Sequence, residues 1–193
     1  MWKKLLLAGI AILPLAGCII SENPLSDPKG AKSDKALIGD WVYRDANGQK
    51  GYLHIGEGVL GKQLGWMEVI KVKGNSEFDP THNFAFPSEV GDHKYFNVVM
   101  LKFPVDDYKE KSASDILKGV SQYAVFKYEV DSNGLTIWEA DKKVLDQAVK
   151  KGEIKGDGIV LKDTTENFRK FVAAHDAELF NSDDKTHCEK LTE

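Results

Sequence analysis

Hydrophobic and polar residues alternate along much of the chain before residue 140, in short runs that are typical of β-strands. The runs are rich in aromatic and β-branched residues, and clusters of Gly, Asn, Asp and Ser between them favour turns. We expect six strands, at residues 40–45, 51–57, 64–72, 93–103, 121–130 and 135–140. Because most of them follow one another closely, the pattern predicts an antiparallel meander. Residues 75–92 are expected to form a long connection.

The spacing of the apolar residues becomes helical after Asp141, which can cap the start of a helix that Gly152 would end. One face of this helix would carry Val144, Leu145, Ala148 and Val149. A short strand at 159–162 precedes a second helix, which opens at Asp163 and places on one face Phe168, Phe171, Val172, His175 and Leu179. The prediction is therefore an α+β domain: a bent antiparallel sheet or open barrel with two C-terminal helices packed on it.

The first residues of the chain combine a basic head with a short apolar run. Lys3 and Lys4 precede an almost wholly apolar segment at residues 5–15, which is about half the length that a helix needs to cross a bilayer. The run ends in Leu15-Ala16-Gly17-Cys18. This arrangement resembles the signal peptide and lipobox of bacterial lipoproteins.

The resemblance implies that residues 1–17 are a signal peptide and that Cys18 is the lipidation site. In that family the cysteine thiol receives a diacylglycerol, the signal peptide is removed, and the new amine is acylated. Ile19 stands where an aspartate would favour the inner membrane, so the resemblance implies an outer-membrane lipoprotein that faces the periplasm. Residues 18–36 are rich in Ser, Pro, Asp, Lys and Gly, a composition that predicts a flexible tether.

The remaining chain is long enough for one domain, which we expect at residues 37–181, followed by a polar tail at 182–193. If Cys18 is lipidated, Cys188 in that tail has no partner in the chain and is expected to be a free thiol. The net charge is −4, and Arg44 and Arg169 are the only arginines. This composition argues against nucleic-acid binding, which needs a basic surface.

Gly39-Asp40-Trp41 opens the first predicted strand and is similar to the Gly-x-Trp motif of the lipocalin and wider calycin families. That resemblance implies a barrel whose closed end is plugged by Trp41. Two departures weaken the match. The second lipocalin motif, Thr-Asp-Tyr, is represented only by Asp106-Asp107-Tyr108, and no late arginine that would cover the tryptophan stands out.

The aromatic residues of the strand region have two interpretations, core packing or the lining of a pocket for an apolar ligand. The residues we expect to line such a pocket are Trp66, Tyr95, Phe126 and Trp138. The sequence contains no Gly-x-Ser-x-Gly, His-Glu-x-x-His or phosphate-loop motif. We therefore predict no catalytic residues, metal ligands or cofactor, and a non-catalytic module that binds an apolar ligand or an envelope protein.

Two hypotheses from other classes remain beside the binding module. A protective inhibitor or immunity-type lipoprotein would place recognition in the connections at 75–92 or 104–118, since loops on a rigid scaffold often carry binding residues. A hydrolase would need a histidine within hydrogen-bond reach of a serine or carboxylate in a cleft.

Overall fold

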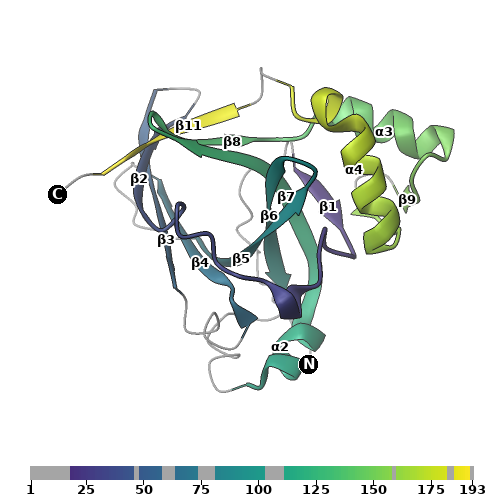
Figure 1. Ribbon diagram of the computed structural model, residues 1–193, viewed down its shortest axis with the longest axis horizontal. Coiled ribbons are helices and arrows are strands. Elements are labelled where there is room, and N and C mark those ends of the chain that lie inside the picture. Colours follow the sequence, from purple (N-terminus) through teal and green to yellow (C-terminus); the bar gives the residue numbers. More distant parts are fainter. Residues whose placement is uncertain are drawn as a thin grey trace, which may run out of the picture.

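A computed structural model describes residues 18–45, 48–57, 64–73, 81–102, 111–157, 160–181 and 185–191. Eight antiparallel strands form a closed barrel, in which each strand pairs with the next along the chain and the last closes the ring between the seventh and the first (Figure 1). They are β2 (Gly39–Arg44), β3 (Lys50–Glu57), β4 (Met67–Lys73), β5 (Thr81–Val90), β6 (His93–Leu101), β7 (Val120–Asp131), β8 (Gly134–Trp138) and β11 (Lys185–Lys190).

The antiparallel meander that the sequence predicts is confirmed, and the sheet is closed instead of open. The strand that closes it, β11, lies in the segment that we expected to be a polar tail, so that expectation is wrong. Strand β5 likewise occupies most of the connection expected at 75–92. With these two additional strands, strand structure dominates the described residues more than an α+β class implies.

Residues 18–36 are also part of the fold, and the expected flexible tether is wrong for them. Strand β1 (Ile19–Ser21) pairs antiparallel with β7 and parallel with β10 (Val160–Leu161), which pairs in turn with β9 (Gly156–Asp157). The Leu25 amide donates to Asn97 Oδ1 over 2.8 Å, and Arg169 donates to the Leu25 carbonyl over 2.7 Å. A short 3-10 helix, η2 (Pro28–Gly30), continues this segment.

Two helices cover the outer face of β6, β7 and β1 on one side of the barrel (Figure 1). They are α3 (Lys142–Lys151) and α4 (Thr165–Leu179). Asp141 caps α3 and Gly152 ends it in the left-handed conformation, as predicted. Helix α4 is capped by Thr164 instead of Asp163, whose carboxylate accepts hydrogen bonds from Lys155, Thr164 and Asn167.

A third helix, α2 (Ala113–Gly119), lies between β6 and β7 in the chain and covers another part of the outer barrel wall. Beneath it, Trp66 stacks on Phe86 with ring centroids 5.7 Å apart. The buried residues that the structure describes thus form three hydrophobic clusters: the barrel interior, the layer under α3 and α4, and the layer under α2. Within the described ranges, no helix has both the length and the apolar character needed to cross a membrane.

Candidate ligand-binding site

One end of the barrel is sealed by Trp41, which we call the closed end. The Trp41 side chain is 1% exposed, and its indole Nε1 donates to the Leu37 carbonyl over 2.9 Å. Met67 and Leu135, both fully buried, belong to the same interior cluster. Lys190 from β11 places its Nζ 5.2 Å from the centroid of the Trp41 ring. A late lysine therefore lies over this tryptophan, where the lipocalin resemblance implies an arginine.

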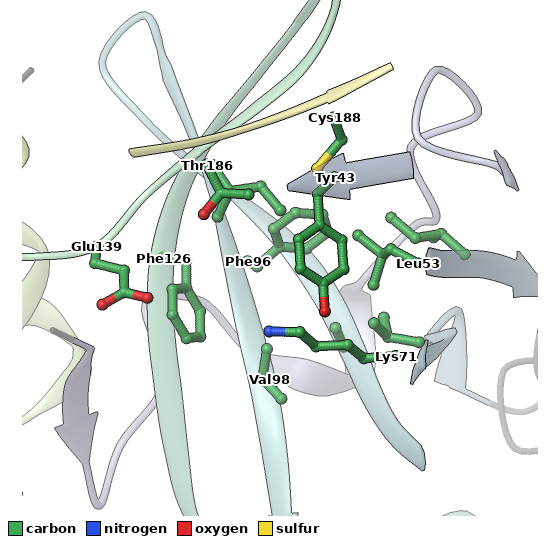
Figure 2. Close-up of a pocket in the computed structure, with 13 residues that line it drawn as sticks. Tyr43, Leu53, Lys71, Phe96, Val98, Phe126, Glu139, Thr186 and Cys188 are labelled. Carbon is green, nitrogen blue, oxygen red and sulfur yellow. The ribbon is translucent and has the colours of Figure 1, made fainter. Parts of the chain in front are cut away.

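The other end, which we call the open end, is loosely filled. Inward-facing Val69, Val98 and Ile137 are only partly buried there. Figure 2 shows the cavity that they help to enclose, with a volume of about 100 Å³. Most of its lining is apolar, and the described residues that line it are Tyr43, Leu53, Ile55, Val69, Lys71, Ala85, Phe96, Val98, Phe126, Ile137, Glu139, Thr186 and Cys188.

Small residues on the inward face make room for this cavity. Ala85 of β5 contributes only a methyl group to the lining. Gly51 of β3 pairs with Tyr43 of β2, and the Tyr43 ring occupies the space that a Cβ on Gly51 would need. The tyrosine can therefore lie across the barrel interior, which a larger residue at position 51 would prevent.

Two charged side chains and a thiol interrupt the apolar lining. The Lys71 ammonium lies 4.9 Å from the centroid of the Tyr43 ring. Cys188 is 1% exposed, and burial raises the pKa of its thiol to about 11, although Lys71 acts to lower it. Glu139 follows the end of β8. The pKa of the Cys18 thiol is raised to about 12, mainly because the thiol is buried and also because the negative charge of Glu139 disfavours the thiolate. Both thiols are thus protonated near neutral pH.

Cys18 lies beside the open end of the cavity. In the β1–β7 pair, Ile20 is opposite Ala124, and both belong to the interior cluster. Cys18 precedes Ile20 by two residues and packs against the same cluster, as expected for the same face of a strand. Strand β8 pairs with β7 as far as Lys127, and β1 pairs with the same edge of β7 from Val125. Cys18 and Glu139 therefore lie close together where the end of β8 meets the start of β1.

The structure does not bring together the four aromatic residues expected to line a pocket. Phe126 lines the cavity. Trp66 lies outside the barrel under α2, and Tyr95 and Trp138 lie in the layer under α3 and α4, where the Tyr95 hydroxyl donates to Asp176 over 2.5 Å. Their aromatic character gave no information on which face of a strand they occupy. The register of β4, β8 and β11 in the sheet would have indicated that the cavity is lined by Lys71, Glu139 and Cys188.

Histidines pair with carboxylates in several places, but none of the described residues that line the cavity is a histidine. His54 Nδ1 lies 2.6 Å from Asp40 Oδ1 on the exposed surface, and His93 Nε2 lies 3.3 Å from Asp176 Oδ2. In the part of the chain that the structure describes, no three His, Cys, Asp or Glu side chains gather in a way that could hold a metal ion. The described lining of the cavity therefore contains no histidine that could act as a base.

Comparisons with protein-family models, with curated proteins and with solved structures gave no match.

Proposed function

We propose that the chain is a lipid-anchored protein of the bacterial cell envelope, which binds an apolar ligand inside its barrel and does not catalyse a reaction. The cavity next to Tyr43 and Phe126 carries the proposal. Protein cores built only for stability are close-packed. Here the interior is tightly packed around Trp41 and loosely packed at the opposite end, which suits a site that a ligand fills.

The position of Cys18 supports the lipid anchor as part of the same design. The lipobox Leu15-Ala16-Gly17-Cys18 suggests a diacylglycerol on this thiol, and the thiol lies beside the open end of the cavity. A lipid there would hold the opening close to the bilayer surface, where apolar ligands are concentrated. With Ile19 after the cysteine, the outer membrane, on its periplasmic side, is the proposed location.

Ligand binding can be tested with the processed chain, residues 18–193, carrying Cys18→Ser so that it stays free of lipid. We expect 1-decanol, an uncharged ten-carbon chain, to bind in isothermal titration calorimetry and to raise the melting temperature. Val98→Trp fills the cavity from β6 and should abolish binding. Val72→Trp, on the outward face of β4, is the matched control and should bind as the wild type does. Absence of binding, or unchanged binding in Val98→Trp, would overturn the proposal.

The anchor needs a separate experiment in cells. The full-length protein should incorporate radiolabelled palmitate and appear at the size of the processed chain. Full-length Cys18→Ser should remain unprocessed and unlabelled, because the thioether cannot form. A processed, unlabelled wild-type protein would remove the anchor from the proposal and leave the cavity to be judged by calorimetry.

A further inference from the structure

We infer that the cavity selects an anionic amphiphile, a single-chain carboxylate, and that Lys71 is the residue that determines this specificity. The inference rests on the proposed binding function and adds the chemical class of the ligand. The tail would lie among the apolar side chains, and the carboxylate would lie at the open end.

The position of Lys71 along β4 gives the ligand its orientation. Met67, Val69 and Lys71 point inward in succession from the closed end toward the open end. Met67 is fully buried, Val69 is partly buried, and Lys71 is the last of the three. An amphiphile that enters tail first would therefore bring its charged end to Lys71.

The surroundings of the Lys71 ammonium suit a carboxylate. Figure 2 shows the side chain crossing the cavity, with its nitrogen directed toward Phe126 and with the Tyr43 hydroxyl facing the same space. Both groups are hydrogen-bond donors. A hydrogen bond from an ammonium to a carboxylate is about twice as strong as one between neutral groups. An uncharged head group would gain less from the same two donors.

Among the described residues of the lining, Glu139 is the other charged one and would act against an anion. In Figure 2 it lies beyond Phe126, on the side of the cavity away from Lys71. The two thiols indicate the same separation of the charges. Lys71 lowers the pKa of Cys188 inside the barrel, whereas Glu139 raises the pKa of Cys18 at the junction of β8 and β1. Lys71 and Glu139 therefore lie on different sides of the cavity, so a head group at Lys71 would lie away from the Glu139 carboxylate.

The size of the cavity favours a slim ligand. Pockets for drug-sized molecules measure roughly 300–1,000 Å³, whereas this cavity measures about 100 Å³. Phe96, Phe126 and Tyr43 narrow it from three strands. A cavity of about 150 Å³ holds benzene, so this one can take the last few carbons of an unbranched acyl chain, with the rest of the chain at the open end, but not a fused-ring molecule.

The experiment compares decanoate, 1-decanol and decylammonium, which share a ten-carbon chain and differ in head-group charge. Calorimetry at pH 7.5 uses the processed chain with Cys18→Ser. We expect decanoate to bind about tenfold more tightly than 1-decanol, the effect of one charge-assisted hydrogen bond, and decylammonium to bind most weakly. Lys71→Met keeps the apolar stem and should remove the difference in affinity between decanoate and 1-decanol. Lys50→Met, at an exposed end of β3, is the control and should keep the preference.

The outcomes separate this inference from the function on which it rests. If none of the three compounds binds the wild-type sequence, the cavity is not a ligand site and both fail. If decanoate and 1-decanol bind equally well, the barrel binds apolar chains but Lys71 does not select among them. Tighter binding of decylammonium would assign the selection to Glu139. The comparison of head groups on the wild-type sequence needs no substitution at position 71, so a folding defect in Lys71→Met would not leave the question open.

Discussion

The substitution Ile19→Ala tests whether residues 18–36 belong to the folded barrel or form a flexible tether. Ile19 is fully buried in the cluster between the barrel wall and helices α3 and α4. Truncating a fully buried isoleucine to alanine costs roughly 2–5 kcal/mol, because transfer free energy is lost and a cavity remains. In a tether, the same change would alter the free energy of unfolding by less than about 0.5 kcal/mol.

Equilibrium unfolding in urea, followed by tryptophan fluorescence, measures this difference in the processed chain with Cys18→Ser. A loss of about 3 kcal/mol would also lower the melting temperature by roughly 6–12 °C for a chain of this length. Leu25→Ala, another fully buried position of the segment, should have a similar effect. Lys32→Ala changes an exposed residue of the same segment and is the control.

The reasoning would be refuted if Ile19→Ala and Lys32→Ala gave the same free energy of unfolding within about 0.5 kcal/mol. The pairing of β1 with β7 would then contribute nothing measurable to stability. A loss confined to Leu25→Ala would place the start of the stable fold after β1. The first result, with Leu25→Ala equally neutral, would restore the tether that the composition of residues 18–36 predicts, whereas the second would confine the tether to the residues before Leu25.

Two further predictions concern titratable groups. The pKa of Asp34 lies below its ordinary value of 3.8: burial raises it, but hydrogen bonds from Lys94, the Ala36 amide and Tyr128 lower it more. The ionised carboxylate therefore stabilises the fold above that ordinary value, and this contribution is lost as the pH falls through the lower folded-state pKa. Asp34→Asn should lower the free energy of unfolding by about 1 kcal/mol at pH 7. Urea denaturation at pH 3 should show a smaller difference between the variant and the wild type. The same difference at both pH values would contradict the lowered pKa of Asp34. Cys188, with a pKa of about 11, should react with iodoacetamide at pH 8 about a hundredfold more slowly than an ordinary cysteine, since only the thiolate reacts. Mass spectrometry of the modified peptide measures the rate, and half-maximal reactivity near pH 9 would show that the thiol is not buried.

The strands and helices with a clear period could be predicted from the sequence because one face of each is buried and the other is not. Strand β5 could not, because Phe84 and Phe86 pack under α2 while Ala85 faces the barrel interior. Both faces are covered there, so the alternation disappears. Strand β11 was missed for the opposite reason, since Cys188 is its only buried residue. Its place in the barrel depends on pairing with β2 and β8, which local sequence does not record.

The candidate site was less predictable than the fold. Aromatic content suggested Phe126 correctly as a lining residue, but it could not separate Phe126 from Trp66, which helix α2 covers from outside. Lysines on strands are usually solvated, so nothing local distinguished Lys71. Its place in the lining follows from register alone: Lys71 is opposite Leu53, and both point into the barrel.

The order of the barrel strands along the chain has a consequence for folding. Seven of them follow one another, whereas β11 comes only after α3 and α4 and must then pair with β2, the first of the eight. Contacts between such distant parts of a chain form slowly, because the intervening loop loses entropy before the contact is made. During synthesis and folding, Tyr43 and the rest of the interior wall would stay accessible until the final strand is inserted. A hydrophobic molecule that is present at that moment could be enclosed as the barrel closes, without passing through the open end.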